Sequence, residues 1–494
     1  MRKRFAFVSP AVPYVLFVNA GYLYMSVKSD VRSVLPASNR YFEQRVSEVV
    51  GQIAEVRDEA RGLHEESLQK IDALRPLFDP VYGSLREMGD RLSAFEASRD
   101  KPSYCNLEYL GLNREYTGRR ILLAGWYGAS YCGDELMMRT MLQHLEGRGV
   151  RVSVLLWDDP DYDFSLLPAC ADQIHYPRSI WELRQLAEYF DVLVWGGGAI
   201  IDERQFNHDP KNINTGNLFI WLSEEMLKRD KDVYAVGLSA NESLEPNTEF
   251  SRRLGGVVSG CSHVSLRDGY SLETLRRAGV DVSHVELCED IVFGNRAVGS
   301  RSPRDDDAPF TVGIVFMTGD VTNAHNRLAL PRILDRMHER YGDACRIRLI
   351  PFYNFWKFDT TLLGQLVEEL GVADRVEVAP YTDDLRELAF LDCDVVVAYR
   401  YHACLVSAAA GIPTLFMCVD DHPHYRNKMR RIAEVFGMSN NLLMASTCLD
   451  DGSFDARFGE ILSAPAIPLA PAGLFQESFD FLERICSSIV EPRA

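Results

Sequence analysis

The sequence predicts an α/β protein with two Rossmann-like, doubly wound halves that face each other across a cleft, preceded by a helical N-terminal extension. Short apolar runs alternate with amphipathic helical segments between residues 119 and 299, and the alternation restarts between residues 310 and 440. A polar segment rich in Ser, Pro and Asp separates these stretches and has the composition of a linker. The 494 residues are also too many for one ordinary hydrophobic core.

Composition narrows the classes of function. Asp and Glu number 71 against 53 Lys and Arg, which gives a net charge of −18. General nucleic-acid binding needs a basic face that displaces counterions, so no nucleic-acid partner is expected. A local basic pocket for an anionic substrate is compatible with this charge. The 11 cysteines contain no C-x-x-C pair; they form neither a disulfide framework nor a zinc pattern, and they fit a reducing compartment.

The first 30 residues form an apolar N-terminal segment. Met1–Arg4 is basic and Phe5–Met25 is largely apolar, as in a signal peptide or signal anchor. Pro10, Pro13 and Asn19 interrupt the run, which is unfavourable for a spanning helix. The unpaired cysteines also argue against export. We therefore favour a segment that packs on the body or touches a membrane surface, in a cytoplasmic protein that is peripheral at the membrane, over an export signal.

Residues 31–118 form the predicted helical extension. Apolar residues at spacings of 4, 3, 4 and 3 make a short heptad seam: Val49, Ile53, Val56, Ala60 and Leu63. Two interpretations stay open, a helical hairpin that covers the body and a short coiled coil through which the chain forms a homo-oligomer. The heptad run is too short to decide between them.

In the first half, residues 119–299, six strands are expected: Arg120–Ala124, Val150–Trp157, Val192–Trp195, Val233–Leu238, Val264–Leu266 and Val285–Cys288. One helix is expected to begin at Asp134, and two more to span Asn217–Lys228 and Ser271–Ala278, the last with Ser271 as its N-cap. Strands that alternate with helices imply a parallel sheet with right-handed crossovers.

In the second half, residues 310–440, the expected strands are Thr311–Phe316, Arg346–Pro351, Val376–Val378, Asp394–Ala398 and Pro413–Cys418. The expected helices are Arg327–Tyr341, Thr360–Leu370, Asp383–Leu391, His402–Ala410 and Tyr425–Phe436. The tail, residues 441–494, carries a helix at Phe475–Ile489 that could cross back to the first half. Ligands of such sheets bind beyond the carboxyl ends of the strands, so the cleft between the halves is the expected site.

Glycines mark two of the candidate site segments. Gly125–Glu135 leaves a strand and opens a helix, and its glycines, including Gly128 and Gly133, would let backbone amides approach an anion. It is neither a Walker loop nor G-x-G-x-x-G, and Asp134 either belongs to the site or merely caps the helix. In Trp195–Gly198, three glycines follow a buried strand. Gly197 and Gly198 then lie in a loop that a ligand or the other half approaches, rather than in a simple tight turn.

Three basic residues and a histidine complete the candidates. Arg267 ends an apolar strand, which is costly unless its charge is paired, either with Asp268 or with an anionic ligand. Another buried strand delivers Arg400 and His402 to its carboxyl end, on the same side if the chain stays extended. There, a cation can hold an anion while an imidazole transfers a proton. Lys428 follows a loop with two Asp and two His, Asp420–His424, whose spacing is poor for a metal site.

In their order and spacing these segments resemble the polysaccharide pyruvyl transferase family. The Gly-Tyr-Tyr-Gly…Gly-Asp-Glu opening of that family is matched by Gly125–Glu135, and its strand with a glycine cluster by Val192–Gly198. Its Ser-x-Arg-Asp segment is matched by Ser265–Asp268. Its Arg-Leu-His-Ala and Gly-x-Pro segments are matched by Arg400–Ala403 and Gly411–Pro413. Tyr401 stands where the family usually has leucine, and Tyr131 stands where asparagine is common. The resemblance covers roughly residues 119–436.

The resemblance implies a GT-B-like fold and a transferase of polysaccharide biosynthesis. The family moves a pyruvyl group from phosphoenolpyruvate to a sugar hydroxyl pair of a polysaccharide or its precursor and forms a ketal, with no metal or cofactor that the motifs reveal. The resemblance implies that His402 is the general acid and that Arg267 and Arg400 bind the phosphate and carboxylate of the donor. With these arginines, the expected substrate-binding residues are Gly128, Gly133, Asp134, Gly197, Gly198 and Lys428.

Two other functions are compatible with the sequence. One is a GT-B-type glycosyltransferase that uses a nucleotide sugar on the same architecture. The other is a non-catalytic assembly protein that acts through its N-terminal helices, although the presence of Arg267, Arg400 and His402 together argues against it.

Overall fold

The computed structural model describes residues 118–157, 171–177, 179–206, 215–241, 244–301, 308–317, 323–342, 345–354, 358–418, 423–445, 448, 452–463, 468 and 470–491. The chain divides into two compact units, Met1–Tyr104 and Cys105–Ala494, and all described residues belong to the second unit. The predicted apolar segment, the heptad seam with its role in oligomer formation, and most of the polar linker lie outside the described residues.

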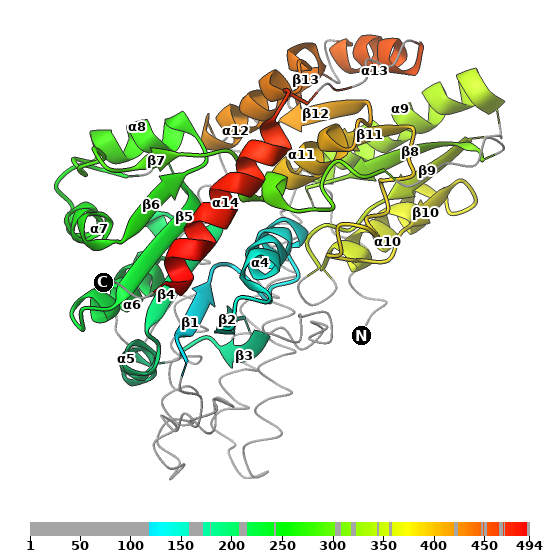
Figure 1. Cartoon of the computed structure of the whole chain (residues 1–494). Helices are drawn as coiled ribbons and strands as arrows, with labels where there is room; N and C mark the ends of the chain where they lie inside the picture. Colours follow the sequence, from blue (N-terminus) through cyan, green and yellow to red (C-terminus); the bar gives the residue numbers. More distant parts are fainter. Residues whose placement is uncertain are drawn as a thin grey trace, which may run out of the picture. The chain divides into compact units, whose positions relative to one another are not determined.

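The first half is a seven-stranded sheet in which neighbouring strands pair in parallel in the order β3-β2-β1-β4-β5-β6-β7 (Figure 1). Its strands are β1 (Arg120–Ala124), β2 (Arg151–Leu156), β3 (Ala171–His175), β4 (Val192–Ile201), β5 (Asp232–Ala240), β6 (His263–Leu266) and β7 (Glu286–Leu287). The strand order reverses between β1 and β4, so the carboxyl ends of these two strands flank the expected ligand crevice.

Helices cover both faces of this sheet. They are α4 (Cys132–Leu145), α5 (Ile180–Tyr189), α6 (Thr215–Leu227), α7 (Glu249–Gly260) and α8 (Gly269–Arg277), with short 3₁₀ turns η3 (Glu203–Gln205) and η4 (Ile291–Gly294). Side chains alternate along β1: Ile121 and Leu123 pack in the core that contains α4, and Leu122 and Ala124 in the core that contains α6 and α7. The strand is therefore apolar on both faces, as parallel sheets require.

The second half is a six-stranded sheet, also paired in parallel, in the order β10-β9-β8-β11-β12-β13. Its strands are β8 (Phe310–Val315), β9 (Cys345–Leu349), β10 (Val376–Val378), β11 (Val395–Ala398), β12 (Thr414–Cys418) and β13 (Leu442–Met444). Its helices are α9 (Asn323–Tyr341), α10 (Phe358–Leu370), α11 (Tyr401–Ala409), α12 (Pro423–Val435) and α13 (Ser453–Ser463), with a 3₁₀ turn, η7 (Ser439–Asn441). Two doubly wound parallel sheets confirm the predicted fold class.

One apolar core runs through both halves. A single cluster of buried residues contains Leu136 of α4 and Phe293 of η4 from the first half, together with Cys404 of α11 and Phe416 of β12 from the second. Helices α4 and α11 are in contact, one from each half. The halves are therefore joined by apolar packing as well as by chain connections.

The last helix, α14 (Leu474–Val490), crosses back to the first half, where it lies beside α4 and η4 (red in Figure 1). Glu483 on α14 is 2.7 Å from His144 Nδ1 and accepts a hydrogen bond from Arg148 at 2.6 Å. Tyr234 Oη of β5 donates to the carbonyl of Ser488 at 2.9 Å. The C-terminal helix thus closes the second half onto the first.

The structure corrects several predicted elements. β4 does not end before the three glycines but continues through them to Ile201. The helix predicted at Asp383–Leu391 is wrong: this segment forms turns, because Asp384 accepts the backbone N–H of Arg386 at 2.9 Å, a local bond that competes with helix formation. The second sheet extends past residue 440 through β13, where we expected the tail to begin.

The structure also adds elements and moves one cap. Strand β3 and helices α5 and α7 were not predicted, although Ser179 and Thr248 cap the two helices by accepting the N–H of Glu182 and Ser251. Ser271 is not the N-cap of α8. That residue is Asp268, whose carboxylate accepts the Ser271 N–H at 2.5 Å.

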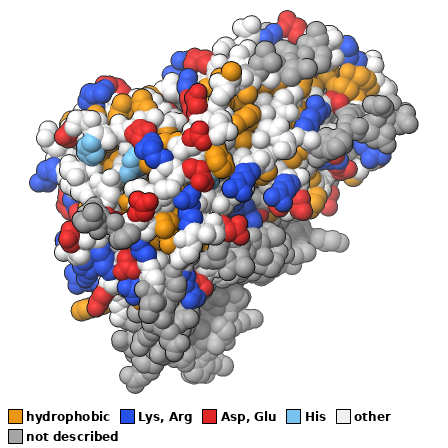
Figure 2. Space-filling model, viewed as in Figure 1, with side chains coloured by type: hydrophobic (Ala, Val, Ile, Leu, Met, Phe, Trp, Pro, Cys, Tyr) orange, Lys and Arg blue, Asp and Glu red, His pale blue; other side chains and the backbone are white. Residues whose placement is uncertain are grey.

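The surface of the described residues mixes both signs of charge. Figure 2 shows Lys and Arg side chains interspersed with Asp and Glu over the face in view. None of the helices within the described ranges is both long enough and apolar enough to span a membrane.

Candidate active site

Three ionisable side chains from distant parts of the sequence meet where the two halves join. Arg267 directly follows β6, Asp290 precedes η4, and His402 lies in the first turn of α11. Arg267 Nη1 donates to Asp290 Oδ2 at 2.7 Å and lies 3.3 Å from His402 Nε2. His402 Nε2 is 3.4 Å from the same carboxylate oxygen. The structure thus brings Arg267 and His402 together across the cleft, with Asp290 as their shared partner. We call these three residues the cluster.

The cluster is shielded from water, and both this burial and the neighbouring charges shift the pKa values of its residues. Arg267 and His402 are each 5% exposed and Asp290 is 1% exposed. Burial would raise the pKa of Asp290, but Arg267 and His402 outweigh it and hold that pKa well below its usual range. Burial lowers the pKa of His402, and Asp290 only partly opposes this effect. Asp290 is therefore anionic and the His402 imidazole neutral at pH 7 when the site is empty.

Two more titratable groups face the cluster. Burial, with added repulsion from Arg267, lowers the pKa of Lys428 on α12 to about 7. Burial raises the pKa of Asp134 in the first turn of α4 to about 7, although Arg267 and Lys428 oppose the shift. Both groups change protonation near neutral pH, as groups at active sites often do. The Tyr401 ring centroid lies 5.0 Å from Arg267 Cζ and 6.0 Å from Lys428 Nζ, so this ring lies near both basic side chains.

Arg400 occupies a separate place beside the cluster. Its Cζ lies 5.3 Å from the Tyr131 ring centroid and 5.6 Å from that of Tyr353, and its Nη2 is 3.5 Å from Asp359 Oδ1. Arg400 was expected on the same side as His402 if the chain stayed extended. It does not stay extended, because Arg400 is the N-cap of α11 and His402 is already helical. The two side chains consequently have different partners.

The glycine-rich loop before α4 reaches the second half. Cys132 N–H donates to the carbonyl of Phe352 at 3.0 Å, and Asn354 N–H donates to the carbonyl of Ser130 at 2.8 Å. These bonds place Gly133 directly against the His402 ring: a Cβ at Gly133 would overlap His402 Nδ1. Glycine is therefore required here for close approach to the imidazole rather than for a turn.

The other predicted glycines allow the loop and helix α4 to pack closely next to the site. Gly128 has φ +73° in the loop, and its N–H donates to Glu135 Oε1 at 2.7 Å, which closes the loop on α4. Gly197 and Gly198 lie within β4 with φ of +88° and +92°. A Cβ at Gly197 would lie 2.5 Å from Met137 Sδ, and one at Gly198 would lie 3.3 Å from Asp134 Oδ1. These two glycines let α4 pack closely on the sheet and leave room for Asp134, so they are not the loop that we expected.

Two buried carboxylates of the site, Asp290 and Asp359, were not predicted. Asp268 was expected as one possible partner of Arg267, but Asp268 caps α8 and Asp290 binds the arginine. Asp290 is the second residue after the last predicted strand of the first half, at the carboxyl edge, and that position was an available signal. Asp359 of α10 accepts the N–H of Phe352 at 2.9 Å and lies beside Arg400. No local pattern marks that pairing.

The predicted loop before Lys428 is described only in part. Residues 419–422 and the side chains of 423 and 424 lie outside the described residues, so the metal alternative for Asp420–His424 is not addressed by the structure. Lys428 itself lies on α12 and not in the loop; it is buried, with 8% exposure, and faces the cluster.

A family model described as polysaccharide pyruvyl transferase matches residues 132–420 of the chain. The match begins at the first residue of α4 and covers more than half of the chain, including Arg267, Asp290, Arg400 and His402. Lys428 lies beyond its end. Among curated proteins, none is significantly similar to the chain in sequence.

Solved structures similar to the chain include sugar-nucleotide enzymes. A putative UDP-N-acetylglucosamine 2-epimerase from Listeria monocytogenes is 9% identical with a TM-score of 0.47, and the alignment covers 76% of this chain and 98% of that one. UDP-GlcNAc 2-epimerase from Neisseria meningitidis, bound to UDP-GlcNAc, is 9% identical with a TM-score of 0.45 and coverages of 74% and 100%. MurG from Acinetobacter baumannii is 12% identical with a TM-score of 0.41 and coverages of 74% and 99%.

Proposed function

Because the chain belongs to the polysaccharide pyruvyl transferase family, we propose that it transfers a pyruvyl group from phosphoenolpyruvate to two hydroxyls of a sugar. The products are a cyclic ketal, on a polysaccharide or its precursor, and inorganic phosphate. One observation carries the proposal: Arg267 and His402, one from each half, lie 3.3 Å apart in a buried site with Asp290 as shared partner. A cation and an imidazole are the two groups that an acidic enol phosphate requires.

The cationic side chains of the site would bind the donor. Phosphoenolpyruvate carries a phosphate and a carboxylate, and Arg267, Arg400 and Lys428 supply positive charge from both halves. Arg267 Nε is buried and has no hydrogen-bond partner among the described residues. A buried N–H group without a hydrogen-bond acceptor is unusual in a folded protein. An oxygen of bound phosphoenolpyruvate would accept this hydrogen bond.

The reaction can then be written with every proton assigned. Negative charge on the bound donor raises the pKa of His402 and favours its imidazolium form. His402 protonates C3 of the enol, and the first sugar hydroxyl attacks C2 and gives its proton to the Asp134 carboxylate. The C2–O bond to phosphate then breaks, and the leaving phosphate takes the proton from Asp134. The second hydroxyl attacks C2 and gives its proton to the neutral His402 imidazole, which restores the imidazolium. The net change is enol phosphate plus diol to ketal plus phosphate.

Binding of phosphoenolpyruvate should take up protons above pH 7. The pKa of Lys428 in the empty site is about 7, so at pH 8 its amine is mostly neutral. The negative charge of the bound donor raises that pKa, so the complex holds more protons than the free protein, and affinity falls as pH rises through this range. Lys428 and His402 both gain charge on binding, so we expect uptake of more than one and at most about two protons per donor at pH 8. Calorimetry in Tris and in HEPES, whose ionisation enthalpies differ, measures it.

Lys428→Arg is the informative variant for this prediction, because arginine keeps the charge but does not titrate. We expect the uptake to fall clearly below the wild-type value while the donor still binds. Lys228→Arg, at an exposed position directly after α6, is the matched control and should behave like the wild type. Unchanged uptake in Lys428→Arg would contradict the assignment of Lys428 to the donor site.

Gly133→Ala should reduce turnover by about 100-fold, because the new methyl group displaces the His402 ring and a shift of about 1 Å at a reacting group has that cost. Steady-state phosphate release measures the effect, and circular dichroism checks the fold. Gly255→Ala on α7 is the control, since a Cβ there meets nothing within 4 Å. Full activity in Gly133→Ala would show that the position of the imidazole does not matter.

The proposed function itself is tested by product analysis. The protein is incubated with phosphoenolpyruvate and neutral sugars, and the mass spectrum should show a sugar whose mass has increased by pyruvic acid less water. Calorimetry then compares phosphoenolpyruvate with UDP-sugars as ligands. Heat from a UDP-sugar but none from phosphoenolpyruvate would favour the nucleotide-sugar glycosyltransferase instead.

A further inference from the structure

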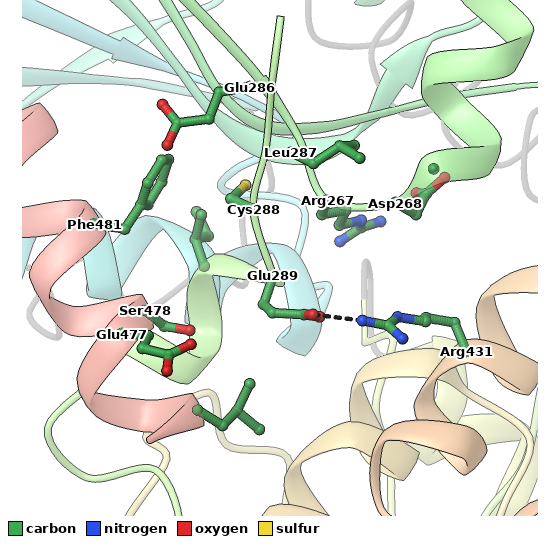
Figure 3. A pocket seen from close by; sticks show the side chains of 13 residues that line it. Arg267, Asp268, Glu286, Leu287, Cys288, Glu289, Arg431, Glu477, Ser478 and Phe481 are labelled. Atoms are coloured by element: carbon green, nitrogen blue, oxygen red, sulfur yellow. Dashed lines mark hydrogen bonds and ion pairs between the residues drawn. The ribbon is translucent and has the colours of Figure 1, made fainter. Parts of the chain in front are cut away.

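A pocket of about 620 Å³ opens next to the cluster. Its walls come from the carboxyl ends of β6 and β7 in the first half, from α12 in the second half, and from α14 (Figure 3). Arg267 lines the pocket and also contacts His402, so the pocket and the cluster share this side chain. Through Arg267, a molecule in the pocket would contact the cluster.

The charges of the pocket exclude an anionic occupant. Its lining has two arginines, Arg267 and Arg431, and four carboxylates. Arg431 binds Glu289 at 2.5 Å across the two halves (Figure 3). Because carboxylates outnumber arginines, the lining repels a phosphate or a second carboxylate, whereas a carboxylate such as Glu477 readily accepts hydrogen bonds from hydroxyl groups.

One wall offers an apolar surface of the kind that a sugar ring requires. The Phe481 ring lies in the lining, and the Arg484 guanidinium carbon is 5.3 Å from its centroid. Arg484 in turn binds Glu286 at 2.6 Å. A pyranose has an apolar C–H face and hydroxyls around its edge, so Phe481 can pack against the face while carboxylates accept the hydroxyls. The volume is in the range of pockets for ligands of about one or two rings.

We propose that this pocket is the acceptor subsite and that it takes a neutral sugar of one or two pyranose rings, with a hydroxyl pair directed toward Arg267 and His402. This inference rests on the proposed function, because only a transferase needs an acceptor beside the imidazole. Arg267 then contacts both the anionic donor and the neutral acceptor. The donor site favours an anion and the pocket disfavours one, so each site discriminates against the other substrate.

The test uses the full chain and a set of p-nitrophenyl hexopyranosides. Dissociation constants for the neutral glycosides and for p-nitrophenyl glucuronide are measured by saturation-transfer NMR, and that for phosphoenolpyruvate by calorimetry. We expect at least one neutral glycoside to bind and the glucuronide to bind more weakly. Phe481→Ala should weaken binding of the neutral glycoside about tenfold, a usual effect of truncating a buried aromatic contact, and leave donor affinity unchanged.

Controls keep the result unambiguous. Phe479 is on the same helix as Phe481, but its ring packs on His144 and does not line the pocket. Phe479→Ala should therefore leave glycoside affinity unchanged. Glu286→Gln removes one negative charge and should reduce the ratio of the glucuronide's dissociation constant to that of the neutral glycoside. Failure of every neutral glycoside to bind, or wild-type glycoside affinity in Phe481→Ala, would overturn the acceptor subsite. Absence of phosphoenolpyruvate binding with intact glycoside binding would instead overturn the proposed function.

Discussion

Substitution of His402 by alanine should lower kcat by about 10²–10⁴-fold while the protein remains folded and still binds phosphoenolpyruvate. The reason is the position of the ring: Nε2 lies 3.3 Å from Arg267, the cation expected to hold the donor, and no other imidazole is part of the described cluster. A proton must reach C3 of the enol before C2 becomes electrophilic, and His402 is the group placed to deliver it. Phosphate release in the presence of a neutral sugar acceptor measures the effect.

The histidine prediction has a simple control. His338→Ala changes an exposed histidine on α9 and should keep wild-type turnover. Donor affinity, measured by calorimetry, should change little in His402→Ala, because Arg267, Arg400 and Lys428 remain. Wild-type kcat in His402→Ala would remove this residue from the mechanism, and lost donor binding would make it an anchor rather than an acid.

Replacement of Arg267 by methionine should reduce the free energy of unfolding by about 3–5 kcal/mol and also abolish turnover. Methionine preserves part of the volume but leaves Asp290, which is 1% exposed, as an unpaired buried carboxylate. The loss should shrink as the pH falls, because without Arg267 the pKa of Asp290 rises and the carboxyl can be protonated. Denaturant unfolding at pH 8 and at pH 5 measures both effects.

A second substitution separates the two roles of Arg267. In the double variant Arg267→Met with Asp290→Asn, no buried charge is left unpaired, so stability should return toward the wild-type value. Turnover should not return, because the donor has still lost its anchor. Arg276→Met on α8, which breaks an exposed pair with Glu273, should change stability by less than about 1 kcal/mol. Restored turnover in the double variant would contradict a direct role for Arg267.

The part of the site that could be predicted follows from sheet topology. Arg267 and His402 each come just after a buried strand, and the carboxyl ends of parallel strands lie at the same edge of a sheet. That rule, applied to two halves that face each other, was enough to expect the two residues to meet. The alternation of strands and helices was likewise local information, and it predicted two parallel sheets, although the edge strands β3 and β13 were missed.

The missed features depend on contacts that no short pattern encodes. The pairing of Asp290 with Arg267 depends on where the turn before η4 places the carboxylate. The separation of Arg400 from His402 depends on a helix that begins one residue earlier than predicted. The glycines of β4 were interpreted from their entropy cost alone, whereas Met137 and Asp134 of a packed helix explain their positions. In each case tertiary packing, not local propensity, decides the outcome.

The apolar core that continues through both halves has a consequence for how the enzyme meets its substrates. If the two halves moved freely about a hinge, they would have to lose rotational freedom in every catalytic cycle before the residues of the site came together. Here Leu136 and Cys404, from different sheets, belong to one packed interior, so that ordering is completed when the chain folds. Under the proposed function, donor and acceptor would therefore enter a preorganised site, and their binding energy would remain available to bring the enol and the diol into reacting distance.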